Sequence, residues 1–194
     1  SASNLKKNLP ILPWSGVKKI GGGFRIDDTI AFHGHSCPGL TIGIRASELA
    51  MEKMDIQNAE NPVCVSETDM CGVDAIQFLT GCSFGKGNLI HRDYGKSAFT
   101  FYDRDMQKGF RAVFNNDFAR DESDRDNRIK RLLEADLSDL FSTEEVTVPP
   151  VRPARILKSI PCDACHEMTM ESRIRLFDGK SFCIPCFKNV EQKI

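Results

Sequence analysis

Apolar residues recur at helical spacing along several stretches of the chain, which predicts helices there. The clearest stretch runs from Leu40 to Met54, and Pro38 before it suits a first helical turn, where its missing N–H costs nothing. We expect further helices at 71–79, closed by Thr80-Gly81, and at 129–140, while 26–31 fits a helix or a short strand. The Leu40–Met54 helix also carries a stripe of small residues, Gly43, Ala46 and Ala50. Such a stripe allows close approach of a neighbouring helix, strand layer or subunit.

Alternation of polar and apolar residues predicts the strands. The expected turn after the second strand contains Asp93, Tyr94 and Gly95, and would join it to the third. A strand followed by a helix, and then by further strands, predicts an α+β fold in which helices pack on a mixed or antiparallel sheet. The expected strands are 63–67, 89–91, 98–102, 110–114 and 144–148.

The length of 194 residues suits one ordinary domain with a small appendage. We place the core domain at 1–150, with an irregular arm over its first 23 residues. A stiff linker follows, because Pro149, Pro150 and Pro153 lie close together. The appendage, at 156–194, has few large apolar side chains, so a metal ion must supply most of its folding free energy.

Two CxxC pairs near the C-terminus have the spacing of a structural zinc site. Between the pairs, 171–180 predicts a hairpin with its turn at Asp178-Gly179, and 187–193 can begin a short helix. Knuckle, hairpin and helix in this order predict a treble-clef or zinc-ribbon finger that holds Zn²⁺. His166 is expected to face solvent, because four thiolates already complete the shell: Cys162, Cys165, Cys183 and Cys186.

Charge and hydropathy narrow the range of partners. The net charge of −1 and the isoelectric point near 6.4 argue against general binding to nucleic-acid backbones or anionic membranes. No segment resembles a secretory signal or a transmembrane span. We therefore expect a cytoplasmic protein with no membrane partner, whose remaining cysteines are reduced thiols.

A dense group of metal-ligand side chains stands directly before the Leu40–Met54 helix. His33, His35 and Cys37 alternate along five residues, so in an extended segment all three would share one face and could bind one ion. A helix N-terminus also favours an anion, which would lower the pKa of Cys37. The alternative is an inert buried cysteine beside a hydrogen-bonded loop histidine.

Three further residues are candidates for the same chemistry. Cys71 also lies at a helix start, where the same electrostatic argument applies, and Asp74 follows in the first turn. Asp74 could equally compensate the helix dipole. Lys86, in a glycine-rich loop without the spacing of a phosphate-binding loop, could bind an anionic group or remain solvated. Cys82, at a helix C-terminus, should be less thiolate-like than Cys37 or Cys71, and Cys64 is expected in the core.

Four motifs follow one another along the core: His33-Gly-His35-Ser-Cys37-Pro-Gly39, Cys71-Gly-Val-Asp74-Ala-Ile-Gln77, Thr80-Gly-Cys82-Ser-Phe-Gly-Lys86-Gly-Asn88-Leu and Asp93-Tyr-Gly-Lys96-Ser-Ala98. Taken in this order, they resemble the FmdE family, which takes its name from a component of formylmethanofuran dehydrogenase. The resemblance implies an α+β core, an intertwined homodimer, a C-terminal treble-clef zinc finger and a cleft used for metal binding or catalysis. It also implies a link to a larger dehydrogenase complex of one-carbon metabolism.

The leading hypothesis is a metal-binding protein that is accessory to one-carbon redox metabolism. A second metal would bind around His33, His35, Cys37 and Cys71, with Cys37 as ligand or nucleophile and His35 as ligand or general base. Cys71 would supply a second thiolate, while Asp74, Lys86 and Lys96 would orient substrate. Two alternatives stay open: a nucleic-acid or protein interaction module that uses the finger, and a freestanding zinc hydrolase or dehydratase with an open three-ligand core site.

Overall fold

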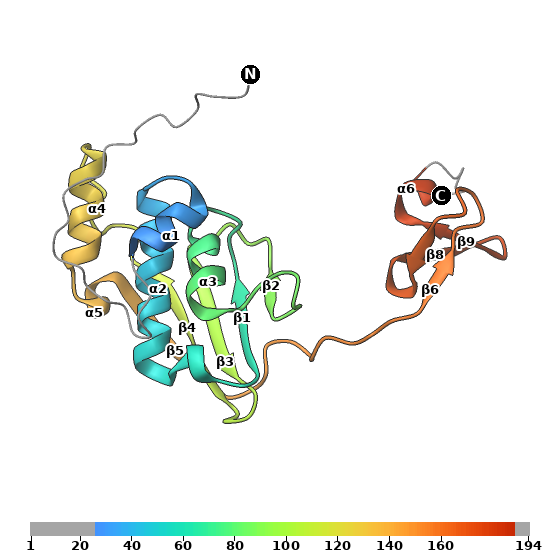
Figure 1. The fold of residues 1–194 in the computed structure, drawn as a ribbon, viewed down its shortest axis with the longest axis horizontal. Helices are drawn as coiled ribbons and strands as arrows, with labels where there is room; N and C mark the ends of the chain where they lie inside the picture. Colours follow the sequence, from blue (N-terminus) through green and yellow to red (C-terminus); the bar gives the residue numbers. More distant parts are fainter. Residues whose placement is uncertain (1–25, 189–194) are drawn as a thin grey trace, which may run out of the picture. The chain divides into compact units, whose positions relative to one another are not determined.

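The computed structural model describes residues 26–188, and Figure 1 shows the arrangement of their helices and strands. The core is an α+β domain, as predicted. No helix in this part of the chain has the length and apolar character needed to span a bilayer. The helices of the core are α1 (Ile26–His33), α2 (Pro38–Met54), α3 (Gly72–Thr80), α4 (Arg125–Glu134) and α5 (Leu137–Leu140); its strands are β1 (Pro62–Ser66), β2 (Leu89–His91), β3 (Ala98–Asp103), β4 (Lys108–Phe114) and β5 (Phe141–Val146).

The sheet is mixed and has the strand order β2-β1-β3-β4-β5. Strand β1 pairs in parallel with β2 and antiparallel with β3, so that Cys64 lies opposite both Leu89 and Phe101. The expected hairpin between β2 and β3 is therefore wrong, because the two strands lie on opposite sides of β1. Segment 92–97 instead crosses the end of β1, where Arg92 N donates to Ser66 O (2.8 Å) and Lys96 N donates to Glu67 O (3.0 Å).

Helices α2 and α3 lie across one face of the sheet (Figure 1), and the main core forms between these helices and the sheet. Each fully buried apolar side chain contributes about 1.5–3 kcal/mol by leaving water. This packing fixes the N-termini of both helices above the sheet. The core includes Leu40, Ile44, Ile76, Leu79, Phe99, Phe101, Phe110, Phe114, Leu132 and Leu140.

The small-residue stripe of α2 lets α3 approach its backbone closely. A Cβ placed on Gly43 would lie 2.1 Å from the carbonyl oxygen of Gly72, well inside any allowed contact. The neighbour of the stripe is therefore α3, one of the three neighbours that the sequence allowed. This contact brings the first turns of α2 and α3 together.

The charged helix predicted at 129–140 is two helices instead of one. Helix α4 begins after Asp124, whose carboxylate accepts from Asn127 N (2.7 Å) as an N-cap. It ends at Ala135, which is extended and whose carbonyl accepts from the buried guanidinium of Arg45 (2.6 Å). A local signal for the break is present, because Asp136 is the N-cap residue of the following helix, α5. The hydrogen bond from Arg45 then connects the break to α2.

The chain forms two compact units, the first ending at Pro153 and the second beginning at Ala154. In the second unit, the predicted hairpin is present around Asp178-Gly179, both of which have positive φ. The helix expected from Phe187 begins earlier, and its proposed end lies outside the described residues, as does the predicted N-terminal arm. The elements are β6 (Ser159–Pro161), β7 (Met168–Met170), β8 (Ile174–Phe177), β9 (Lys180–Cys183) and α6 (Ile184–Phe187).

Candidate metal centres

The finger brings its four cysteine sulfurs within 4.8 Å of one another. Cys162 and Cys165 lie on the knuckle after β6, where His166 N donates to Cys162 O (2.9 Å). Cys183 ends β9 and Cys186 lies in α6, and Cys183 N donates to the Cys162 sulfur (3.3 Å). His166 is exposed, as expected. The arrangement matches a closed tetrahedral S4 site.

Hydrogen bonds give the finger thiols different pKa values. Backbone N–H donation, first from Cys165 and then from Cys183, lowers the pKa of Cys162 to about 6, which favours its thiolate at neutral pH. Neighbouring thiols, first that of Cys183, raise the pKa of Cys186 to about 12. Four thiolates crowded together repel one another, so full deprotonation requires a cation among them.

The second cluster lies in the core and contains the four residues predicted for it. His33, His35, Cys37 and Cys71 offer ligand atoms that all lie within 4.8 Å of one another. The segment is not extended, so the expected alternation on one face is wrong. His33 ends α1, Gly34 turns the chain with φ +93°, and Cys37 is the N-cap of α2.

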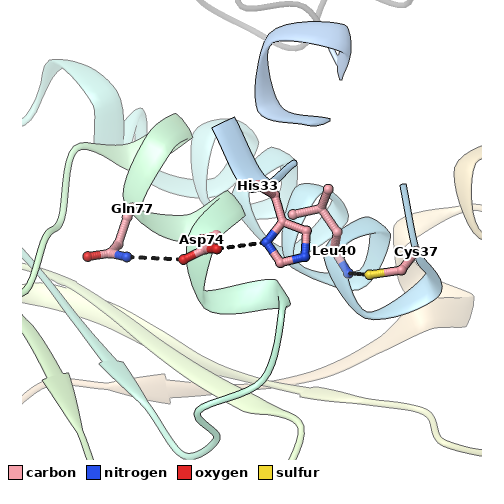
Figure 2. Close-up of polar contacts among 5 residues, drawn as sticks. All are labelled: His33, Cys37, Leu40, Asp74 and Gln77. Atoms are coloured by element: carbon pink, nitrogen blue, oxygen red, sulfur yellow. Dashed lines mark hydrogen bonds and ion pairs between the residues drawn. The ribbon is translucent and has the colours of Figure 1, made fainter. Parts of the chain in front are cut away.

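The His33 ring is oriented by the first turn of α3. Its Nδ1 lies 2.7 Å from Oδ2 of Asp74, whose Oδ1 lies 3.5 Å from Nε2 of Gln77 (Figure 2). The His33 side chain is only 9% exposed, and its Nε2 is buried without a hydrogen-bond partner in the described part of the chain. Asp74 therefore selects the tautomer with a proton on Nδ1 and a free lone pair on Nε2.

The two thiols lie at the facing starts of α2 and α3. Cys37 is buried, and its sulfur accepts from Leu40 N (3.3 Å) as the helix cap (Figure 2). A Cβ on Gly39 would lie 3.9 Å from the Cys71 sulfur and 4.0 Å from the Cys37 sulfur, so both sulfurs lie beside the first turn of α2. Burial, followed by the adjacent Cys37 thiol, raises the pKa of Cys71. For Cys71 the expected lowering by the helix dipole is wrong, because desolvation and its neighbours outweigh the dipole.

The donor set of the core cluster fits a metal ion. An unpaired buried imidazole nitrogen costs free energy unless something binds it. Two thiols and two imidazoles are the donors that Zn²⁺ and other borderline transition metals prefer. A carboxylate on the far nitrogen of a histidine is the usual outer partner of a metal-bound imidazole.

A cavity of about 510 Å³ borders the core cluster. His33 and Cys71 belong to both, and Asp74, the hydrogen-bond partner of His33, also lines the cavity. A molecule in the cavity could therefore reach the cluster. Two of its apolar lining side chains are largely open to solvent, Met70 (64% exposed) and Phe84 (78% exposed). Among the described residues the lining contains no Lys or Arg: His33, Ser66, Thr68, Asp69, Met70, Cys71, Val73, Asp74, Gln77, Phe84, Leu89 and His91.

Several sequence candidates lie elsewhere. Lys86 does not line the cavity, and its ammonium donates to the carbonyl of Gly81 (2.9 Å) at the end of α3. Lys96 is also absent from the lining. Cys64 and Cys82 are fully buried, and burial raises the pKa of both. Cys82 is thus a poor thiolate, because desolvation disfavours its charged form.

Sequence reasoning missed Gln77, Met70 and Phe84 as parts of the site. Gln77 lies one helical turn after Asp74, and that spacing could have indicated the contact. Met70 and Phe84 are isolated apolar residues in loops, and only the tertiary structure places them at one cavity.

Fold and site together define an α+β protein with a His/Cys cluster in its core and a separate four-cysteine finger. Residues 32–147 match the family described as "FmdE, Molybdenum formylmethanofuran dehydrogenase operon". The chain belongs to this FmdE family, as its motifs indicated. Residues 155–192 match the prokaryotic dksA/traR C4-type zinc finger, so the second unit is a zinc finger of that type.

Two individual proteins are similar to this chain. A "Probable S-adenosyl-L-methionine-binding protein" of Archaeoglobus fulgidus is 30% identical over 187 residues, covering 80% of this chain and 50% of the relative. The chain thus spans about half the length of that curated relative. The crystal structure of a "tungsten formylmethanofuran dehydrogenase subunit e (fmde)-like protein" from Syntrophus aciditrophicus has a TM-score of 0.68 at 24% identity, covering 91% of this chain and 99% of that one. The similarity to this crystal structure supports the α+β fold described above.

Proposed function

We propose that the core binds a second metal ion through His33, His35, Cys37 and Cys71, and that the protein is accessory to one-carbon redox metabolism. The observation that carries the proposal is the buried, unpartnered Nε2 of His33, held toward the cluster by Asp74. Such a nitrogen is costly unless a ligand binds it. The other three residues of the cluster each offer a ligand atom within 4.8 Å of one on His33.

The residues of the site have separate tasks in this proposal. Cys37 and Cys71, as thiolates, would neutralise a divalent cation, while Asp74 fixes the His33 tautomer. The metal would act as a Lewis acid toward a small molecule in the adjacent cavity. The cavity wall supplies apolar contact through Met70 and Phe84.

The link to one-carbon metabolism rests on the family. Its description refers to the formylmethanofuran dehydrogenase operon. Within residues 26–188, the clusters of three or more metal-ligand side chains are the core site and the finger. Two sites of this kind suit an accessory component or a metal carrier better than the complete redox machinery of such an enzyme.

Metal analysis of anaerobically purified protein tests the proposal. We expect two metal ions per chain in the parent and one in Cys37→Ala, because the finger keeps its own ion. Cys37→Ser keeps a capping side chain on α2, so equal loss in both variants would exclude a folding defect. Cys64→Ala is the matched control, since this buried cysteine lies outside both clusters and both ions should remain. One ion in the parent, or equal metal content in parent and Cys37 variants, would refute the core site.

Binding of S-adenosylmethionine is a second candidate, supported by the name of the Archaeoglobus relative. The cavity favours it because apolar side chains line it together with two carboxylates, Asp69 and Asp74, and no described Lys or Arg. A sulfonium cation suits this charge. Calorimetric titration should show binding of S-adenosylmethionine, and weaker binding of S-adenosylhomocysteine, which lacks the positive sulfur. Asp69→Asn should reduce the difference in affinity between S-adenosylmethionine and S-adenosylhomocysteine. Equal affinity of the parent for these two compounds would contradict this candidate.

A further inference from the structure

Three of the four core donors are held in place by the protein. Asp74 fixes the His33 ring at 2.7 Å. The Cys37 sulfur is buried and accepts the Leu40 N–H at the start of α2. Cys71 is half-buried against the Cys37 thiol, directly before α3. His33 and Cys37 cannot leave the cluster without breaking a hydrogen bond, and Cys71 packs beside Gly39 at the facing helix starts.

His35 differs from the other three donors. Its side chain is exposed, and no hydrogen bond to its ring is present among residues 26–188. Its described contact is with the His33 ring, at 4.5 Å between centroids. A histidine without an outer hydrogen-bond partner is a less strongly oriented metal ligand than one that has such a partner.

The backbone on both sides of His35 is anchored. Gly34 N donates to Ile30 O (2.8 Å) at the end of α1. On the other side, the Arg125 guanidinium of α4 donates to the carbonyl of Ser36. The His35 side chain can therefore rotate away from the cluster while the loop and the other donors stay in place.

We infer that His35 is the exchangeable ligand of the core metal, and that its departure opens one coordination position to a small neutral donor. The inference rests on the proposed core metal. Three fixed ligands with one open position is the arrangement of catalytic zinc sites, whereas four fixed ligands is that of structural sites. A single site can change between the two if one ligand is mobile.

The charge of the site sets the class of the incoming donor. Two thiolates cancel the charge of a divalent ion, and the nearby Asp74 carboxylate adds a negative charge. A neutral nitrogen or sulfur donor replaces the neutral imidazole of His35 without changing this balance. An anion would be repelled, so we expect selectivity for imidazole over azide.

Cobalt substitution in the full chain tests the inference, because the visible spectrum of Co²⁺ reports the ligands directly. The Cys37→Ser spectrum provides the finger background, which is subtracted from the others. We expect His35→Ala to keep a core Co²⁺ ion and to show a saturable spectral change with imidazole but not with azide. His33→Gln keeps a polar side chain of similar size but removes the ligand that Asp74 supports. It should bind the core ion about 10–100-fold more weakly than His35→Ala, because an outer hydrogen-bond partner typically contributes that much to metal affinity.

The outcomes separate the two proposals. Absence of core Co²⁺ from the parent would refute the core metal site itself. If the parent holds the ion but His35→Ala loses it as completely as His33→Gln, the site is real and the exchangeable-ligand inference is wrong. The inference is equally overturned if His35→Ala retains the ion and imidazole leaves its spectrum unchanged, or if azide binds better than imidazole.

Discussion

At the scale of single residues, the chemistry of the core site depends on which partner each side chain finds. Asp74 was a candidate for orienting substrate or for compensating a helix dipole, and the structure gives it a specific partner in His33. Lys86, with a similar sequence signal, instead donates to the backbone of its own loop. A local pattern selects polar residues, but the tertiary contact decides what each one does.

The Asp74–His33 contact predicts a loss of metal affinity in Asp74→Asn. An amide can hold the ring but withdraws the negative charge that makes Nε2 a better donor, so we expect affinity for the core metal to fall about 10–100-fold. Competition with a chromogenic chelator measures this affinity, and the finger should keep its ion in the variant. Asp69→Asn makes the same chemical change in the same cavity without touching His33, and should leave core affinity intact. Equal effects of both variants would contradict the positioning role.

A second residue-level prediction concerns stability in acid. Both oxygens of the buried Glu67 carboxylate accept from Arg111, at 2.6 and 2.9 Å. The hydrogen bond to Arg111 lowers the pKa of Glu67, so its stabilising effect is complete above the unfolded pKa and is lost as pH falls through the folded value. Glu67→Gln should cost about 1.5–3 kcal/mol at pH 7.

Urea unfolding of parent and Glu67→Gln at a series of pH values measures this effect. The difference between the two should shrink as the carboxylate of the parent becomes protonated. A difference that stays constant down to pH 3 would contradict the assignment.

At the scale of elements, the core site is set by how two helices meet. Each helix places one thiol at its N-terminus, and the contact of Gly43 with Gly72 sets the separation of those termini. The glycines therefore act on the site through helix packing, although neither offers a ligand atom.

Gly43→Ala should separate α2 from α3. The new methyl group would overlap backbone atoms of Gly72, which cannot move aside as a flexible side chain can. Overpacking of this kind costs about 1–3 kcal/mol. We expect a lower melting temperature and loss of the core metal with retention of the finger ion. Gly85→Ala is the matched control, since a Cβ there meets nothing within 4 Å and should leave both properties unchanged.

At the scale of the whole molecule, the chain consists of two units with different sources of stability. The core has a large apolar interior under two helices. In the described part of the finger, the buried side chains are cysteines, Cys162 and Cys183. The fold of the finger therefore depends on its ion, whereas that of the core does not depend on the finger.

Chelation should unfold the finger alone. Structural zinc in small fingers contributes about 10–16 kcal/mol near neutral pH, more than this unit can replace by packing. Hydrogen exchange after chelation should show loss of protection in β6–β9 and retained protection in β1, β3 and β4. Cys165→Ala should give the same pattern without chelator, and simultaneous exposure of the core strands would contradict independent stability.

The homodimer remains a prediction, which sedimentation of the full chain can check.

The sequence alone was sufficient wherever the signal is local. The two residues between the cysteines of each CxxC pair indicated a zinc site, Asp178-Gly179 marked the hairpin, and Pro38 with apolar periodicity marked α2. Each of these depends on backbone geometry within a few residues, which the sequence encodes directly. The motifs in order also identified the family.

The tertiary structure alone decided what depends on distant contacts. It placed β2 and β3 on opposite sides of β1, connected the end of α4 to Arg45 of α2, and made Asp74 the partner of His33. It also showed that burial, rather than a helix dipole, dominates the pKa of Cys71. Packing and desolvation are sums over neighbours far apart in the chain, and no local pattern of residues contains that sum.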